Sequence, residues 1–235
     1  MSMPALSMAL PQAQPASWLQ LFQLMSPNLP VGGFTYSQGL EWAVEAGWVS
    51  NADEFGQWLT DQLEEGLVYL DWPLLNRLYA AATAGDLAAF TGWIDLLVAS
   101  RESEEFRLEE GQRGEAFYRV IKDWGLPDTP LFAPQLKRSQ LAAMAWFGAR
   151  SGLGVEQLAL GWGFALLEGA VMAAIKLVPI GQQRGQTLLR QLSARVPAAY
   201  AMACMVTEQE IGGSLTRLAI ASACHEIQYT RLFRS

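Results

Sequence analysis

The chain has 235 residues, of which 51% are hydrophobic, and a net charge of −7. This balance argues against a nucleic-acid partner, because binding a phosphate backbone needs clustered Lys and Arg. No Pro-, Ser- or Gly-rich linker divides the chain, so we expect a single domain over residues 17–235. Cys204 and Cys224 form no CxxC motif, which favours reduced thiols in a cytoplasmic protein.

The N-terminal half is expected to be a series of helices. Residues 1–16 lack the basic start and apolar core of a signal peptide, and we expect a flexible tail there. Apolar spacing predicts a helix over residues 17–25, before a loop, SPNLPVGGF, with two prolines and paired glycines. For the helices that follow, we expect N-caps at Ser37, at Asn51 or Asp53, and at Asp86. We also expect a bend or a new first turn at Trp72-Pro73 and the end of a helix at Gly85.

The middle of the chain combines a charged helix with a proline-rich stretch. Residues 101–119, RESEEFRLEEGQRGEAFYR, contain two favourable ion pairs with four-residue spacing, Glu109–Arg113 and Glu115–Arg119. This segment is either a solvated helix face or a dedicated binding face. Three prolines predict a loop over residues 124–134, and a helix is expected over residues 135–150.

The most apolar run, LALGWGFALLEGAVMAAIKLV, begins at Leu158. Small residues at every fourth position, from Gly161 to Ala173, form one stripe that allows a neighbouring backbone to approach closely. Glu168 in the middle argues against a membrane span. Further helices are expected over residues 182–194, over residues 196–206 and from Ser214 to the end of the chain. Because no stretch alternates like a strand, the predicted fold is all-α, a single-domain helical bundle around a long buried central helix.

Few residues suit catalysis or metal binding. His225 is the only histidine, and adjacent helical side chains such as Cys224 and His225 diverge, so we expect neither a tight metal site nor a cofactor. GQQRGQ lacks the phosphate-loop pattern and is either a helix–helix corner or a polar patch for a partner. A competing interpretation is a helical small-molecule-binding domain or enzyme, with a pocket beside the central helix that uses Glu168 and Lys176.

The last eleven residues, HEIQYTRLFRS, combine apolar and basic side chains to the end of the chain. Aromatic residues and Arg are enriched where proteins bury surface against partners, so this tail resembles an interaction peptide. The alternative is a last helical turn folded onto the chain's own core.

Four segments together resemble the UreF family of urease accessory proteins. They are LMSPNLPVGGFTYSQGLEWAVEAGWV over residues 24–49, SRESEEFRLEE over residues 100–110, AIKLVPIGQQRGQ over residues 174–186, and HEIQYTRLFRS over residues 225–235. In the second segment the family often reads RETRELREE, from which Ser103 and Phe106 depart. With matching intervals, the resemblance covers nearly the whole chain after residue 17.

The resemblance implies a non-enzymatic, all-α scaffold that forms a homodimer. It implies that the scaffold binds UreD (also called UreH), recruits the GTPase UreG and docks on apo-urease, where nickel and a carbamylated lysine are installed. It also implies that the tail lies against the complex that presents the SPNLPVGGFTYS loop, where we expect Tyr36 to accept a bond from Arg231. We further predict that the corner around Lys176, Gln182 and Gln186 belongs to a partner face on the UreG side. The predicted partner-binding residues are Tyr36, Lys176, Gln182, Gln186, Arg231, Leu232, Phe233 and Arg234.

Overall fold

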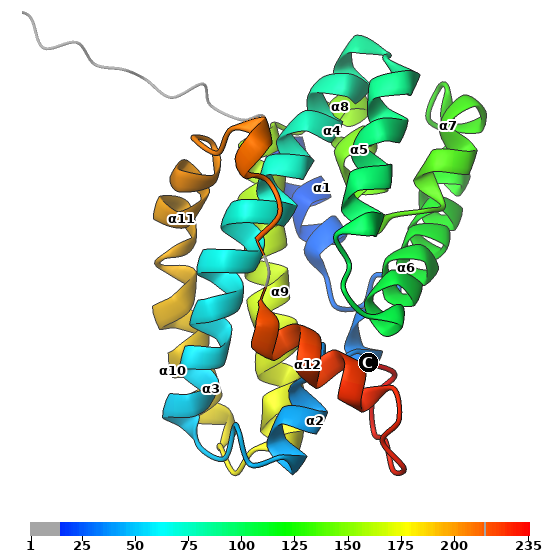
Figure 1. Cartoon of the computed structure of the whole chain (residues 1–235). Helices are drawn as coiled ribbons and strands as arrows, with labels where there is room; N and C mark the ends of the chain where they lie inside the picture. Colours follow the sequence, from blue (N-terminus) through cyan, green and yellow to red (C-terminus); the bar gives the residue numbers. More distant parts are fainter. Residues whose placement is uncertain (1–14, 214) are drawn as a thin grey trace, which may run out of the picture.

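The computed structural model describes residues 15–213 and 215–235, and within them it contains helices and no strand, which confirms the all-α prediction (Figure 1). Residues 1–14 of the expected N-terminal tail and the expected N-cap Ser214 lie outside these residues. The elements are α1 Pro15–Met25, η1 Gly33–Thr35, α2 Leu40–Glu45, α3 Ala52–Asp61, the π-helix η2 Gln62–Asp71, α4 Trp72–Ala84, α5 Leu87–Ala99, α6 Glu104–Asp123, α7 Thr129–Leu136, α8 Gln140–Ser151, α9 Val155–Leu177, α10 Gln182–Ser193, α11 Val196–Ala203, η3 Glu208–Glu210 and α12 Thr216–His225.

Local capping chemistry places several helix ends where the sequence indicates. The Asn51 side chain accepts from the backbone N–H of Asp53 and Glu54, and Asp86 caps α5 by accepting from Ala89 N. Gly85 ends α4 in the left-handed conformation that glycine adopts easily.

The expected N-cap at Ser37 is wrong, because α2 starts later, at Leu40, after Gly39. Gly39 has a φ of +77°, and a Cβ there would lie 3.1 Å from the Cβ of Ala221 on α12. The chain therefore turns sharply where α12 crosses it, and the helix begins only after this turn.

Trp72-Pro73 forms the first turn of α4, the second of the two expected outcomes. Helices α3 and α4 are joined by the π-helix η2, and Pro73 lies in the first turn of α4, where its missing N–H costs little. The π-helix carries Gln62 and Asp71 inward, and both are buried. A local π-helix often marks a functional region, and no sequence rule used above would have found it.

The predicted loop over residues 124–134 is wrong in its second half, which forms α7. Pro130 lies in the first turn of α7, and this short helix accommodates Pro134 near its end. The helix expected from residue 135 is also interrupted, because Ser139 starts α8 by accepting from Ala142 N. Helix α6 packs so tightly against this turn that a Cβ on Gly114 would lie 2.6 Å from Ser139 N.

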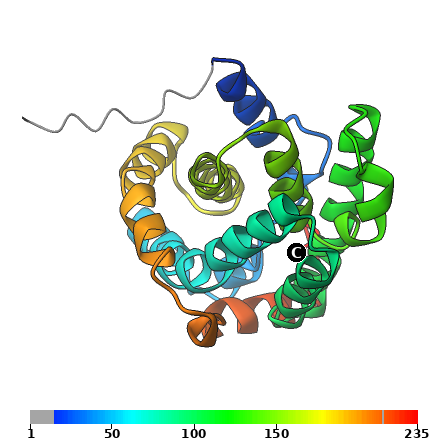
Figure 2. The same ribbon diagram turned by 90° about the horizontal axis from the view of Figure 1, so that it is seen from above.

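Helix α9 lies at the centre of the surrounding helices when the molecule is viewed from above (Figure 2). It packs against α10, α1, α11 and α8. The predicted burial of this helix does not hold for its whole surface, since Phe164 is 39% and Met172 50% exposed. By length and composition alone α9 could cross a membrane, but central helices of globular proteins pass the same test.

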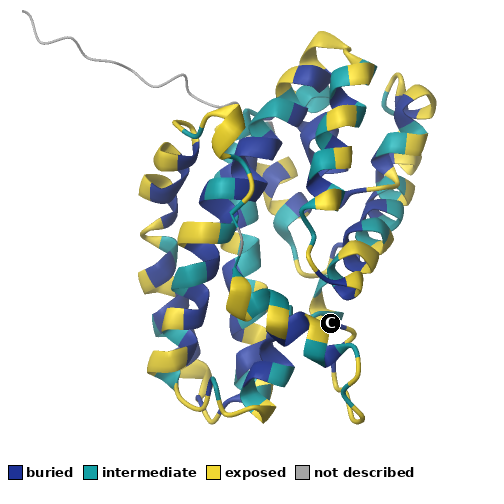
Figure 3. Ribbon diagram, in the orientation of Figure 1, coloured by how far each residue is buried: buried dark blue, intermediate teal, exposed yellow. Residues whose placement is uncertain are grey.

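The final helix does not run to the end of the chain. Helix α12 ends at His225, and the last ten residues form a non-helical tail that folds back toward α6 (Figure 1). Most of this tail is exposed or half-buried (Figure 3), and within it only Phe233 and Ser235 are buried.

Candidate partner-binding face

The tail lies beside the segment that follows η1. Arg234 N donates to Thr35 O at 2.8 Å. The backbone N–H groups of Ser37 and Gln38 both donate to Ser235 O, and the Ser37 hydroxyl donates to the same oxygen at 2.6 Å. Gln38 adopts a φ of +52°, an uncommon conformation for a residue with a side chain. The contacts with Ser235 help to hold this strained segment in place.

A buried carboxylate on α2 binds the tail backbone. Glu41 accepts from Leu232 N at 2.6 Å through one oxygen and from Phe233 N at 2.9 Å through the other. Successive N–H groups of this kind form an anion-binding concavity. Here the anion is a side chain of the same molecule, and it holds the non-helical tail against α2.

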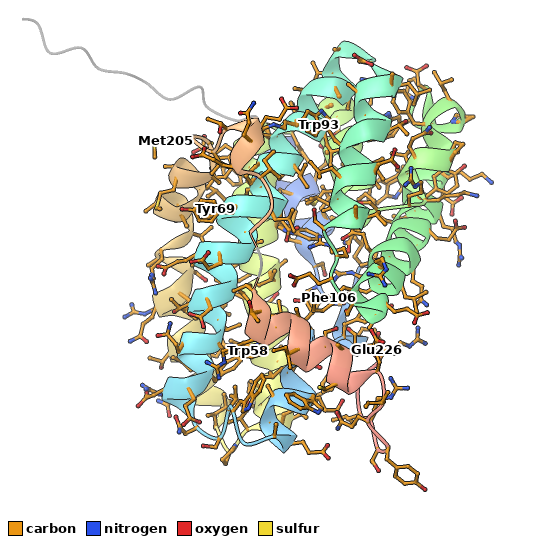
Figure 4. The ribbon with its side chains drawn as sticks, viewed as in Figure 1. Trp58, Tyr69, Trp93, Phe106, Met205 and Glu226 are labelled. Atoms are coloured by element: carbon orange, nitrogen blue, oxygen red, sulfur yellow. The ribbon has the colours of Figure 1, made fainter. Side chains whose placement is uncertain are left out.

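Glu41 also belongs to a buried cluster of charged and titratable side chains around His225. Nε2 of His225 lies 3.2 Å from Glu41 Oε2, and Nδ1 lies 2.8 Å from Glu105 Oε2. The other oxygen of Glu105 accepts from Arg231 Nη1 at 2.7 Å. Glu226, at the end of α12, accepts from the first N–H groups of α6, where a negative charge is favoured (Figure 4).

The expected bond between Arg231 and Tyr36 is wrong. Arg231 bonds to Glu105 instead, because an ionised carboxylate is a stronger acceptor for a guanidinium group than a phenol. The Tyr36 hydroxyl donates to Gln112 Oε1 at 3.0 Å, and its ring lies 6.0 Å from the Arg113 guanidinium carbon. The tail does lie beside this loop, as the contacts of Thr35, Ser37 and Gln38 above show.

The tail is both anchored and exposed. Phe233 and Ser235 are buried, whereas Ile227, Tyr229 and Leu232 project into solvent. The two sequence interpretations are therefore each partly correct. The tail folds onto its own core, though not as a helical turn, and it still presents apolar side chains outward.

Lys176 emerges at the surface, and its Nζ lies 5.5 Å from the Phe233 ring centre. Gln182 and Gln186 are exposed on α10, and no described contact joins them to the tail. Gly185 of the same corner packs against α9, where its Cβ would lie 3.1 Å from Val171. The GQQRGQ corner is thus a helix–helix contact that also exposes its amide side chains.

The charged segment of α6 is not simply a solvated face. Glu105, Glu109 and Glu110 are buried, while the Glu115–Arg119 pair is exposed. Glu109 bonds to Arg113 at 2.7 Å and accepts from Ser235 Oγ at 3.1 Å. The four-residue spacing of Glu105 and Glu109 places them on one helix face, but the sequence gives no sign that this face is buried.

A second group of charged side chains is centred on Arg101. Arg101 Nη2 bonds to Asp71 and to Glu110, each at 2.8 Å. Burial raises the pKa of Asp71, against the opposing effect of Arg101. Burial also opposes ionisation of Glu110, but Arg101 and the Ser139 hydroxyl outweigh it and lower the pKa of Glu110.

A groove of about 290 Å³ borders the tail between α1, the loop after it and α9. Its walls are mostly apolar, and Glu168 and Lys176 contribute the charged groups that the small-molecule alternative requires. Partial burial raises the pKa of Glu168. Among the described residues no cluster of three or more His, Cys, Asp or Glu side chains could hold a metal ion.

Comparison with known proteins decides the family. The family model for UreF matches residues 49–193. A Pseudomonas putida KT2440 protein named urease accessory protein UreF is 56% identical over 92% of this chain and 97% of its own length. Proteins of the same name from Citrobacter koseri and Klebsiella pneumoniae MGH 78578 are 48% and 47% identical, with the same coverage.

The chain belongs to the UreF family. Residues from each of the four segments that resemble UreF meet at the tail, although the segments are far apart in the sequence. Residues 35–41 bind the tail backbone, Glu105 and Glu109 of α6 bind Arg231 and Ser235, and Lys176 covers Phe233. We call this surface the tail face; it comprises residues 35–38, Lys176 and the tail, residues 226–235.

Proposed function

We propose that the chain is a non-enzymatic scaffold in urease maturation. Together with UreD/UreH it recruits the GTPase UreG to apo-urease, so that nickel and the lysine carbamate can be installed in the urease active site. The observation that carries this proposal is the tail face, where residues from the other three UreF-like segments contact a tail that exposes apolar and basic side chains.

The tail face has the physical character of a protein-binding surface. Tyr229 and Leu232 are exposed beside Arg231 and Arg234, and aromatic and Arg side chains dominate the binding energy of many interfaces. Bonds from Glu41 and Glu105 hold the backbone in place before any partner arrives. A pre-ordered surface loses less conformational entropy on binding, which favours affinity.

The small-molecule alternative has a groove in the place it requires, but relatives over nearly the whole chain carry the name of an accessory protein.

The proposal further includes a homodimer and a cytoplasmic location. Exposed apolar side chains on α1 and α9, among them Trp18, Phe22 and Met172, support self-association. Sedimentation velocity of the pure chain would contradict the homodimer if only monomer were present at micromolar concentration.

Lys176→Ala tests the tail face directly. The expected result is weaker recruitment of UreG and lower urease activity in cells that carry this variant as their only UreF. Lys176 is exposed, and its contact with the Phe233 ring should be worth about 0.5–1 kcal/mol, so the fold should persist. The measurements are UreG capture, urease activity and thermal unfolding.

Lys122→Ala is the matched control, since this lysine is exposed in the last turn of α6, outside the tail face. It should leave UreG capture and urease activity unchanged. If Lys176→Ala behaved like Lys122→Ala, the role of Lys176 would be refuted, and if it unfolded the chain, Lys176 would be structural.

A further inference from the structure

His225 is completely buried between two carboxylates, and the hydrogen-bond pattern determines its protonation. One oxygen of Glu41 accepts from Leu232 N, and the other accepts from Phe233 N and faces His225 Nε2. Both Glu41 oxygens are therefore occupied by N–H donors, which leaves no role for a carboxyl proton.

Glu105 is paired with a permanent cation. One of its oxygens accepts from the Arg231 guanidinium group, and the other faces Nδ1 of His225. An ionised carboxylate acts only as an acceptor, so with Glu41 and Glu105 both ionised each ring nitrogen must supply a proton. A neutral imidazole could donate to one carboxylate only and would direct a lone pair at the other.

The charges around His225 balance only if the ring is an imidazolium ion. Glu41 faces it from α2 and Glu105 from α6, while Arg231 of the tail pairs with Glu105. Glu226, the next residue on α12, turns instead to the start of α6. Two buried carboxylates then meet one imidazolium and one guanidinium group, whereas a neutral ring would leave a buried negative charge uncompensated.

The bonds also form a closed ring that begins and ends on the tail. It runs from the Leu232 and Phe233 N–H groups to Glu41, then to His225, to Glu105 and back to Arg231. His225 is the only member that joins the two carboxylates. Without it, Glu41 on α2 and Glu105 on α6 would each hold the tail separately, with no positive charge between the two carboxylates.

We propose that His225, held as an imidazolium ion between Glu41 and Glu105, is the positioning residue that keeps the tail in its partner-binding conformation. The inference deepens the proposed function and rests on it for the partner, but the order of the tail can be tested without one. Loss of the His225 side chain, or of one of its ring protons, should release residues 226–235 from α2 and α6 while the helices remain.

The first experiment is nitrogen NMR of the full chain labelled with ¹⁵N-histidine. The sequence contains one histidine, so the spectrum reports a single ring. We expect both ring nitrogens to show imidazolium shifts and a bonded proton near neutral pH. A neutral ring with one protonated nitrogen would overturn the proposal, and this measurement needs no variant.

The second experiment follows trypsin cleavage after Arg231 and Arg234 by mass spectrometry. His225→Gln retains a polar side chain, but it carries no positive charge and has one donor nitrogen where the imidazolium ring has two. Tail cleavage should therefore become about tenfold faster, with unchanged helix content by circular dichroism. Cys224→Ser is the matched control, because Cys224 is the half-buried neighbour of His225 on α12. An unchanged cleavage rate in His225→Gln would refute the positioning role.

Capture of UreD and UreG by the same variants separates this inference from the proposed function. Faster cleavage together with lost capture is the expected outcome. Faster cleavage with full capture would leave His225 as the residue that positions the tail, but would show that the tail does not bind these partners.

Discussion

Arg101→Met is expected to lower the free energy of unfolding by about 3–5 kcal/mol, the usual cost of leaving buried charges without their partner. The Arg101 guanidinium group is the shared partner of Asp71 and Glu110, and both carboxylates are buried. Methionine fills part of the same volume without a charge. Urea unfolding followed by circular dichroism measures the loss.

Arg119→Met is the control for Arg101→Met. Arg119 pairs with Glu115 at the surface, where an ion pair contributes at most about 1 kcal/mol. If the two variants were equally stable, the Arg101 cluster would not be important for the fold. Partner capture should fall only in proportion to unfolding, because Arg101 lies outside the tail face.

The pH dependence of the Arg101→Met penalty follows from Glu110. Arg101 helps to lower the pKa of Glu110 in the folded state. A lowered carboxyl pKa adds stability above the unfolded-state value, and this stability is lost as the pH falls through the folded-state value. The difference between wild type and Arg101→Met should therefore shrink in acid, where protonation removes the uncompensated charge.

The features predicted correctly from the sequence are local. Asn51 and Asp86 cap helices through bonds to residues two or three positions away, so their spacing in the sequence contains the required information. The same logic failed for Pro134, because a proline is tolerated inside a helix as short as α7. A proline in the first turn of a helix, such as Pro130, costs little, whereas one in the interior of a long helix is strongly destabilising.

The features that could not be predicted depend on residues distant in the chain. Glu41 binds a backbone about 190 residues further on, and nothing near HEIQYTRLFRS indicates that its N–H groups will meet a carboxylate. Glu105 and Glu109 share a helix face, but only tertiary packing buries it. The resemblance to UreF indicated which segments matter, whereas the structure shows that they meet.

The tail offers a pair of substitutions that separates folding from binding. Phe233 is 7% exposed and packs under Lys176, whereas its neighbour Leu232 is 64% exposed. Phe233→Ala should cost about 3 kcal/mol of stability, because it removes the buried aromatic anchor of the tail. Leu232→Ala should change stability by less than about 0.5 kcal/mol.

Partner binding should depend on these two residues for different reasons. Leu232→Ala should weaken capture of UreD and UreG because it removes an exposed contact from an otherwise intact surface. Phe233→Ala should weaken capture because the tail detaches, and tail cleavage by trypsin should then accelerate as it does in His225→Gln. Deleting residues 231–235 would combine both effects, since it also removes the partners of Glu41, Glu105 and Glu109.

The result that would contradict this division is a stable Leu232→Ala variant with full partner capture. The exposed side of the tail would then be dispensable, and Phe233 would serve only to complete the core beside α9. If Leu232→Ala instead lost capture at wild-type stability, with slow tail cleavage, the defect would lie in the contact itself. The buried side of the tail would then act as the anchor, and the exposed side as the part that partners bind.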